Sequence, residues 1–181
     1  MTEWKVRRAS SSDAESFAAI GAFLFRQAYG LTHPEPTLST YLASAFDPSQ
    51  CALMLRDPHV TVLAAEAARG EWIGYVQLRE GEPDRSVRLE LPLRGARPLE
   101  IVRFYVDQRW HGRGVAQSLM AACEQEARSR SCDVLWLQAW QQAPQALAFY
   151  RKSGFRVIGT AIFHFGDRRD DDFLLARSLS G

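Results

Sequence analysis

The sequence predicts an α/β fold with a mixed central sheet, and three observations carry that prediction. Apolar runs at residues 60–67 and 72–78 flank a turn-forming Ala-Arg-Gly-Glu segment, a pattern typical of a β-hairpin. A β-branched and aromatic run at residues 101–106 indicates a buried strand, which enters a glycine turn that opens an amphipathic helix. Helices and strands then alternate to the end of the chain, which is the order of elements in α/β proteins.

Length and composition are those of one soluble globular domain. The 181 residues fit a single domain that covers residues 1–181 and buries a sizeable core. Hydrophobic residues make up 46% and charged residues 24%, and the formal net charge of +1 gives no global field that would attract nucleic acid or a membrane surface. The sequence also lacks an apolar run of about 18 residues that could span a bilayer. We therefore expect neither nucleic acid nor a membrane as a partner.

The cysteines and histidines argue against disulfides and against a metal site. Cys51, Cys123 and Cys132 are an odd set without CxxC spacing, and no signal-like segment follows Met1. A reducing cytoplasm is the compartment that this pattern predicts. The four histidines are scattered along the chain, so we expect no bound metal.

The N-terminal half predicts one strand followed by three helices. Residues 3–8 form the strand, and the Ser-Ser-Ser-Asp run that follows supplies N-cap candidates for the first helix. Two prolines and a glycine at residues 29–36 predict a loop. A second helix is expected over residues 38–46, and Asp47, followed by proline, caps a short helix through Leu55. Four apolar residues of the first helix are predicted to point inward, namely Phe17, Ile20, Phe23 and Leu24.

The C-terminal half predicts the rest of the sheet. Residues 79–98 are charged and rich in Gly and Pro, which indicates an exposed connection with a short strand around residues 87–91. After the glycine turn and its helix, the expected elements are a central strand at residues 133–139, a helix at 144–152 and strands at 155–165 and 172–179.

The glycine turn has the layout of an anion-binding site. Gly112 and Gly114 flank Arg113, and a residue without Cβ lets the backbone turn sharply and approach a ligand closely. The helix that follows presents backbone N–H groups without intrahelical partners and the positive end of its dipole, which suits a phosphate or pyrophosphate. Arg113, and Arg109 just before the turn, add positive charge. The alternative is an ordinary strand-to-helix connection in which glycine only eases the turn.

Two motifs make the sequence resemble a known family, the GCN5-related N-acetyltransferases. The segment from His111 to Ala116 resembles the acetyl-CoA loop of that family, which reads Gln or Arg, two residues, Gly, one residue, then Gly or Ala. The two small positions are kept, and His111 stands where Gln or Arg is usual. Residues 146–155 resemble the AxxxYxxxGF motif of the family. Both motifs occur in the family's order, and the resemblance extends over nearly the whole chain.

The resemblance implies a fold and a co-substrate. The family's sheet is mostly antiparallel and flanked by helices, and the strand before the glycine turn and the strand after it are splayed apart to admit a thioester. The co-substrate is acetyl-CoA, with the backbone of the turn on its pyrophosphate and the preceding strand edge on its pantetheine amides and thioester carbonyl. The cofactor-binding residues implied are Phe104, Tyr105, Val106, His111, Gly112, Arg113, Gly114, Val115, Ala116 and Gln117.

Two further residues match positions that carry out proton transfer in the family. Tyr150 matches the tyrosine placed to protonate the leaving sulfur, since a phenol with a reference pKa near 10 holds its proton at neutral pH. The alternative is that Tyr150 only packs, like Phe149 beside it. Glu100 opens the strand on which the family often has an acidic residue that deprotonates the incoming ammonium through water, although a surface glutamate without a role fits equally well.

The implied reaction is transfer of an acetyl group from acetyl-CoA to a primary amine, by direct attack in a ternary complex. Segments at residues 25–30, 41–46 and 165–175 resemble the PaiA-like polyamine-acetylating branch of the family, which implies a polyamine or another small amine as acceptor. Asp170, Asp171 and Asp172 could attract such a cation, although a charge run is more often a solvated turn.

Other functions stay open at this point. Ala143 lies where many relatives have an Asn that binds the cofactor, and together with His111 it would suit a non-catalytic acetyl-CoA-binding sensor or interaction module. Tyr150 argues against that alternative. A dinucleotide-binding domain is disfavoured because the turn lacks a third glycine. The sequence leaves the acceptor and the oligomeric state undecided, a homodimer included.

Overall fold

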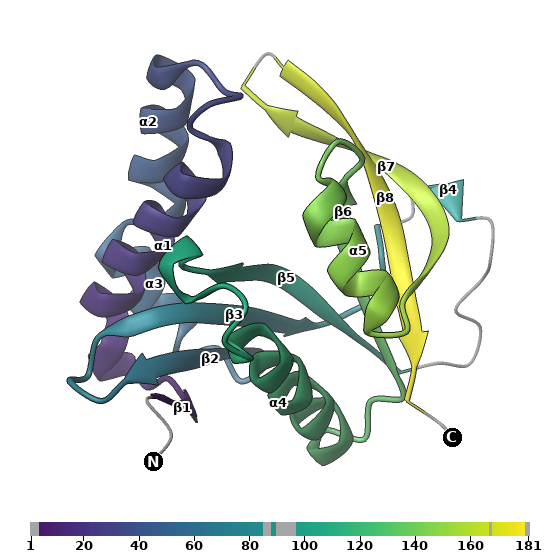
Figure 1. Cartoon of the computed structure of the whole chain (residues 1–181), viewed down its shortest axis with the longest axis horizontal. Coiled ribbons are helices and arrows are strands. Elements are labelled where there is room, and N and C mark those ends of the chain that lie inside the picture. The colour runs from purple at the N-terminus through teal and green to yellow at the C-terminus, as the bar shows by residue number, and fades with distance from the viewer. Residues whose placement is uncertain (1–3, 85–87, 90–96, 167, 180–181) are drawn as a thin grey trace. The chain divides into compact units, whose positions relative to one another are not determined.

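The structure, a computed structural model, describes residues 4–84, 88–89, 97–166 and 168–179 and consists of two compact units (Figure 1). The first unit comprises Met1–Leu78 and Arg103–Cys123, and the second comprises Arg79–Val102 and Glu124–Gly181. Strands β3 (Trp72–Glu80) and β5 (Pro98–Val106) and helix α4 (Val115–Ser129) contribute residues to both. The predicted single domain at residues 1–181 stays a prediction.

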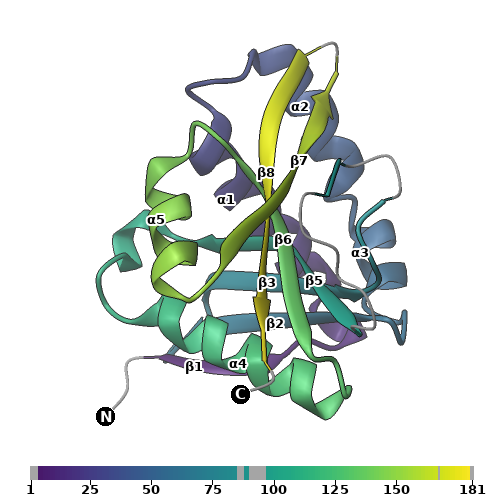
Figure 2. The ribbon, with the colours of Figure 1, turned by 90° about the vertical axis from the view of Figure 1, so that its right-hand side faces the viewer.

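The first unit has a sheet that is covered on both faces. Its strands lie in the order β1 (Trp4–Arg8), β2 (Val60–Ala67), β3 and β5, and β1 pairs antiparallel with β2. Consecutive residues of β2 and β3 are buried, which requires cover on both sides of the sheet. Figure 2 shows α1 (Ala14–Tyr29) and α3 (Pro48–Met54) on one side of these strands and the first turns of α4 on the other. The hairpin predicted from the apolar runs at residues 60–67 and 72–78 is confirmed.

The first helix buries a narrower set of residues than predicted. Phe17 and Leu24 are buried in α1 as expected, but the Phe23 side chain is 47% exposed. The buried face repeats at Phe17, Gly21 and Leu24, and Phe23 lies about 100° around the helix from Leu24, outside this stripe. Gly21 is part of the stripe because the Phe46 ring lies against it, only 2.2 Å from where a Cβ would be.

The loop predicted at residues 29–36 is shorter than expected. Helix α1 continues through Tyr29, and α2 (Glu35–Ala45) begins three residues before the predicted helix. Pro36 stands in the first turn of α2, where a missing N–H removes no intrahelical hydrogen bond, so proline here starts a helix. Helix α3 agrees with prediction, and Asp47 caps it by accepting hydrogen bonds from the backbone N–H groups of Ser49 and Gln50, both at 3.0 Å.

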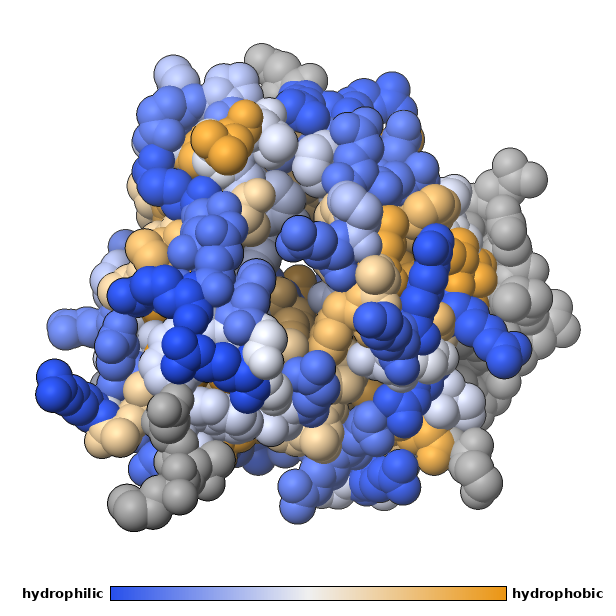
Figure 3. Space-filling view, viewed as in Figure 1, coloured by the Kyte–Doolittle hydropathy of each residue, from blue (hydrophilic) through white to orange (hydrophobic). Residues whose placement is uncertain are grey.

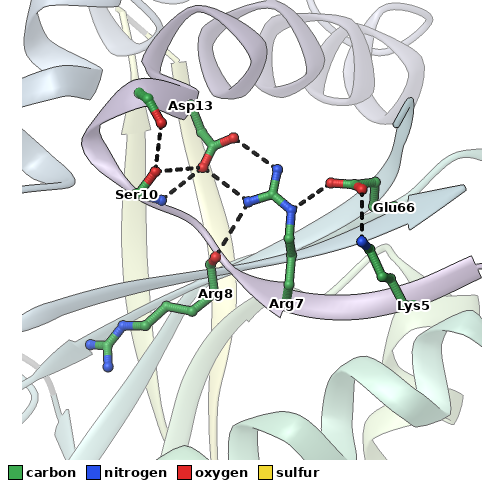
Figure 4. Close-up of polar contacts among 7 residues, drawn as sticks. Lys5, Arg7, Arg8, Ser10, Asp13 and Glu66 are labelled. Atoms are coloured by element: carbon green, nitrogen blue, oxygen red, sulfur yellow. Dashed lines mark hydrogen bonds and ion pairs between the residues drawn. The ribbon is translucent and has the colours of Figure 1, made fainter. Parts of the chain in front are cut away.

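An ion-pair network joins β1, β2 and the start of α1 in the first unit (Figure 4). The Arg7 guanidinium donates to both carboxylate oxygens of Asp13, at 3.0 and 2.8 Å, and its Nε donates to Glu66 at 2.5 Å. Asp13 also accepts from the backbone N–H of Ser10 at 2.8 Å. The hydrogen bonds from Arg7 lower the pKa of Asp13 to about 2, against the opposing effect of burial. The 3₁₀ helix η1 (Ser11–Asp13) is thereby tied to the sheet.

The second unit completes a mixed, mostly antiparallel sheet with a helix. Its strands lie in the order β5, β6 (Val134–Trp140), β8 (Arg168–Ser178), β7 (Arg156–Phe165) and β4 (Arg88–Leu89). The β5–β6 pair is parallel and covers Pro98 to Ile101 against Val134 to Leu137, while the β6–β8, β7–β8 and β4–β7 pairs are antiparallel. Helix α5 (Pro144–Lys152) has the predicted bounds. The predicted fold class is confirmed.

Strand β8 begins four residues before the predicted strand. It starts at Arg168, so the acidic run at residues 170–172 lies in a strand and not in a solvated turn. Antiparallel pairing with β7 extends to Phe165 and Arg168, and the turn that remains contains Gly166, whose φ is +59°. The charges misled the prediction because alternate residues here face opposite sides of the sheet, and Asp170 and Asp172 are buried while Asp171 is exposed.

Further features of the described residues complete the fold. The three cysteines are buried thiols and form no disulfide with one another. A cluster of Val134, Trp136, Ile158, Leu174 and Ala176 forms part of the core of the second unit, and Figure 3 shows hydrophobic residues at the surface over β7. In the described part of the chain, no helix is both long and apolar enough to cross a membrane. Of the strand predicted at residues 87–91, only β4 lies within the described residues.

Candidate functional site

The two units divide the predicted site residues between them. All residues predicted to bind acetyl-CoA, from Phe104 to Gln117, belong to the first unit. Glu100 and Tyr150, the predicted base and acid, belong to the second. Each group is therefore built from the elements of its own unit.

The segment between β5 and the glycine turn is held by Asp107. This carboxylate is 1% exposed and caps η2 (Gln108–Trp110) by accepting from the Arg109 backbone N–H at 2.9 Å. The Arg109 guanidinium donates to the same carboxylate through Nη2 at 2.6 Å and Nε at 3.0 Å. Burial acts to raise the pKa of Asp107, but the hydrogen bonds from Arg109 outweigh it and lower the pKa. Arg109 thus fastens the loop, and its contribution of charge to a bound ligand stays a prediction.

The glycine turn has the geometry of a backbone cradle. Gly112 and Gly114 have φ angles of +74° and +87°, a region that favours glycine, and no atom lies within 4 Å of where a Cβ would stand on either. Helix α4 begins at Val115, and Ser118 N–H donates to the Gly114 carbonyl at 3.1 Å. The earlier N–H groups of a helix have no intrahelical acceptor. The open side of this turn therefore suits an anionic ligand.

His111, which stands where Gln or Arg is usual, makes a hydrogen bond within the same segment. The Nε2 atom of His111 lies 3.0 Å from the carbonyl oxygen of Val106, at the end of β5. A donor at this nitrogen ties the start of the glycine turn back to the strand, which a neutral ring with its proton on Nε2 can provide. The Arg113 guanidinium lies 5.1 Å from the centre of the Trp110 ring, a cation–π distance.

The end of β5 is fixed by a close approach of β3. A Cβ on Gly74 would stand 2.8 Å from the carbonyl oxygen of Tyr105 and 3.2 Å from the Val106 Cα, closer than neighbouring atoms tolerate. The Asp107 N–H donates to the Ile73 carbonyl at 2.9 Å, so β3 holds the same segment by a hydrogen bond. Gly74 thus sets the position of the backbone that is predicted to hold the pantetheine arm.

Tyr150 is fixed in the second unit by aromatic neighbours. It is 8% exposed on α5, and its ring packs edge-on against Phe149 at 5.5 Å and Phe155 at 5.8 Å between ring centres. Packing on two sides restricts the phenol to one orientation. A hydroxyl held in this way can transfer a proton to a fixed partner, and the acid role stays a prediction.

Glu100 is engaged in an ion pair. Its Oε2 atom accepts from Arg79 Nε at 3.1 Å and from Nη2 at 2.6 Å. The negative charge of Glu100 is therefore compensated within the second unit, which reduces its attraction for a cationic acceptor. Its role as a base stays a prediction.

Asp172 is a second acidic residue that could act as a base, because its carboxyl is buried and its pKa is raised. The carboxyl is 6% exposed, and burial raises its pKa to about 6, with Asp170 and Asp171 adding to the rise and a hydrogen bond with Gln138 opposing it. Asp170, in contrast, pairs with Arg168 at 2.7 Å. Sequence reasoning considered Asp172 only as an attractive charge, since burial of the acidic run was not visible in the pattern.

Glu100 and Asp172 face the same side of the sheet without forming a pair. Glu100 is in register with Trp136, and Asp172 is in register with Trp140 on the same strand. Residues four apart on β6 point to one face but lie roughly 13 Å apart. The two carboxylates therefore belong to separate positions on that face.

Ala143 leaves the start of α5 without a side-chain cap. It stands at the N-cap position and makes no side-chain hydrogen bond there, while its carbonyl oxygen accepts from the Leu147 N–H at 3.0 Å. An Asn here would present an amide at this helix start, and Ala cannot.

Comparisons with known proteins identify the family of this chain. The family model described as Acetyltransferase (GNAT) family matches residues 24–155, more than half of the chain. An uncharacterized N-acetyltransferase from the pepI 3′ region of Lactobacillus delbrueckii subsp. lactis is 27% identical over 179 residues, which cover 99% of each sequence.

Solved structures share the fold. PaiA N-acetyltransferase from Thermoplasma acidophilum, in complex with coenzyme A, has a TM-score of 0.73 and 16% identity over 97% of this chain and 98% of that chain. Arabidopsis thaliana NAA60 in complex with acetyl-CoA has a TM-score of 0.72 and 16% identity over 98% and 99% of the two chains. At these identities the similarity establishes the fold.

Proposed function

Because this chain belongs to the acetyltransferase (GNAT) family, we propose that it transfers an acetyl group from acetyl-CoA to a primary amine on a small molecule. The observation that carries the proposal is the backbone cradle at Gly112 and Gly114 on the start of α4. In this proposal both units form one N-acetyltransferase domain over residues 1–181. The three buried cysteine thiols, none of them in a disulfide, support a reducing compartment, the cytoplasm, as the place of the reaction.

The first unit supplies the binding residues. The backbone N–H groups of residues 112–117 face the pyrophosphate of acetyl-CoA, where a positive helix end stabilises an anion. The backbone of Phe104 to Val106 binds the pantetheine amides and donates an N–H to the thioester carbonyl. That N–H stabilises the negative charge that develops on the carbonyl oxygen during attack. Because main-chain groups do this work, His111 at the usual Gln or Arg position does not prevent it.

The second unit supplies proton transfer. The amine nitrogen forms a bond with the thioester carbon, the carbon–sulfur bond breaks, and the thiolate accepts a proton from the Tyr150 hydroxyl. A carboxylate must first remove a proton from the incoming ammonium. Glu100, acting through water, is the base that the family resemblance implies. Asp172 is the alternative, since a carboxyl with a pKa of about 6 accepts a proton near neutral pH.

The test of this function changes the cradle and measures binding. Gly114→Trp fills the open side of the turn, so the rise in melting temperature that acetyl-CoA gives the wild type should be lost. Gly70→Trp is the matched control, because Gly70 has a φ of +83° and equally open surroundings but lies in the β2–β3 turn. The control should keep the full shift, which separates loss of the cradle from backbone strain.

Two outcomes would contradict the proposal. An undiminished acetyl-CoA shift in Gly114→Trp shows that the turn does not bind the pyrophosphate. Acetyl-CoA binding to the wild type without release of CoA, across a panel of primary amines, supports instead a non-catalytic sensor or interaction module. CoA release is followed with a thiol reagent in the same experiment.

A further inference from the structure

Arg103 is a half-buried cation with no carboxylate partner among the residues that the structure describes. It lies on β5, directly before the segment proposed to bind the pantetheine arm, and its Nη1 donates to the Gln77 side-chain oxygen at 2.9 Å. Its Nη2 approaches the Tyr41 hydroxyl at 3.4 Å, and its guanidinium lies 4.6 Å from the centre of the Phe46 ring. Among the described residues, no carboxylate pairs with Arg103.

The surroundings of Arg103 are aromatic and poor in compensating charge. Tyr75 is fully buried beside it, and its hydroxyl has no hydrogen-bond partner within the described chain. The Tyr105 ring lies 5.9 Å from that of Tyr75. Burial raises the pKa of Tyr75 and of Tyr105, so both phenols stay neutral and cannot compensate the guanidinium. Burial acts against the guanidinium charge, and the neutral hydrogen-bond partners and the Phe46 ring offset that effect without supplying an opposite charge.

We propose that Arg103 binds a carboxylate of the acceptor, so that the acceptor is an amino acid or another small amine that also carries a carboxylate. The inference rests on the proposed acetyl transfer and names its substrate class. A guanidinium forms paired, charge-assisted hydrogen bonds with a carboxylate. Arg103 directly precedes the backbone proposed to hold the thioester, so the anion and the reacting amine belong to one small molecule.

The same observation disfavours a polyamine. An uncompensated arginine in an aromatic setting repels a di- or tricationic acceptor. The carboxylates that suggested a polyamine are partly engaged already, since Glu100 binds Arg79 and Asp170 binds Arg168. We therefore expect spermidine to be a poor acceptor.

The experiment compares acceptors that differ by one carboxylate. Ornithine is measured against putrescine and tyrosine against tyramine, with kcat/KM obtained from CoA release and the acetylated product identified by mass spectrometry. The ratio of the two kcat/KM values within each pair is then compared between the wild type and its variants. Amine basicity differs within a pair but is the same for every protein, so a change in the ratio reports recognition of the carboxylate.

Two variants remove the recognition in different ways. Gln77→Glu places a carboxylate at the oxygen that already contacts Arg103, so it occupies the guanidinium with almost no change in shape. Arg103→Met removes the charge and keeps an unbranched side chain. Each should lower the preference for the carboxylate-bearing acceptor by roughly 10- to 100-fold, the range of a charged hydrogen bond. Arg56→Met, at an exposed position of the first unit, should leave the preference unchanged.

The outcomes separate this inference from the proposed function. If the wild type prefers the amine member of both pairs, or if Gln77→Glu leaves the ratio unchanged while it folds and binds acetyl-CoA, Arg103 does not recognise a carboxylate. A stronger preference for O-phosphoethanolamine over the carboxylate-bearing acceptors would also overturn the assignment. Failure of every acceptor to release CoA would instead count against acetyl transfer itself.

Discussion

At the scale of single residues, neighbours decide what a charged group does. Arg109 and Arg103 lie six residues apart around the end of β5, and the sequence offers no reason to treat them differently. Arg109 is bound to Asp107, which is 1% exposed, so it serves as a fastener of the loop. Arg103 has neutral hydrogen-bond partners and aromatic rings around it, so it keeps its charge for a ligand. The proposed binding of a ligand by Arg103 therefore follows from the lack of a carboxylate beside it in the described chain.

Tyr150 gives the sharpest test of catalysis at this scale. Tyr150→Phe removes one hydroxyl and keeps the ring packing against Phe149 and Phe155. Binding of acetyl-CoA should stay the same, while kcat falls by roughly 10- to 1000-fold because the leaving thiolate loses its proton donor. Steady-state kinetics and a thermal shift with acetyl-CoA measure the two effects. Unchanged turnover with a good acceptor would mean that Tyr150 only packs.

Local motifs made part of the site predictable, and burial decided the rest. Gly112, Gly114 and Tyr150 stand in short motifs whose spacing alone points to a turn and a helix, so sequence reasoning found them. Asp172 and Arg103 act through their surroundings. The hydrogen-bond partners of Arg103 come from β3 and α2, which are far from β5 along the chain, and no local pattern reports such an arrangement.

At the scale of elements, prediction succeeded where hydrophobic spacing and caps agreed. The hairpin of β2 and β3, helix α3 with its Asp47 cap and helix α5 follow from such signals. It failed at the start of α2, where Pro36 was taken as a breaker although the first helical turn accepts proline. It failed again at β8, because three consecutive acidic residues indicated a turn, although they lie in a strand and alternate between the two faces of the sheet.

The close approach of β3 to β5 yields a prediction about an element. Gly74→Ala adds a methyl group 2.8 Å from the Tyr105 carbonyl oxygen, so the backbone of β5 must move. We expect a loss of about 1–3 kcal/mol in the free energy of unfolding, as for an overfilled core position. The KM for acetyl-CoA should rise several-fold more than the KM for the amine, because the displaced strand is proposed to hold the pantetheine arm. Denaturant unfolding and two-substrate kinetics measure both, and an unaltered KM for acetyl-CoA would contradict this role of β5.

At the scale of the whole molecule, two aspartates make stability depend on pH in opposite directions. Hydrogen bonds from Arg7 lower the pKa of Asp13 from 3.8 to about 2, so its contribution is present above its unfolded pKa and is lost as pH falls towards 2. Burial raises the pKa of Asp172 from 3.8 to about 6. The protonated form of Asp172 is favoured in the folded state, so its contribution is present below pH 3.8 and is lost as pH rises through 6. The two acids act in separate pH ranges.

Asp172→Asn should therefore stabilise the protein at neutral pH. The amide imitates the protonated carboxyl and carries no charge, so the variant avoids the cost of ionising a buried carboxyl, at most about 3 kcal/mol and less where solvent screens the charge. Urea unfolding between about pH 4 and pH 8 should show nearly equal stability at the acid end, an advantage of the variant that grows up to about pH 6, and a constant advantage above it. Asp171→Asn, at an exposed neighbour in the same strand, should follow the wild type throughout. If the Asp172→Asn curve also runs parallel to the wild type, Asp172 is ionised at little cost, and the case for it as a base near neutral pH fails with that result.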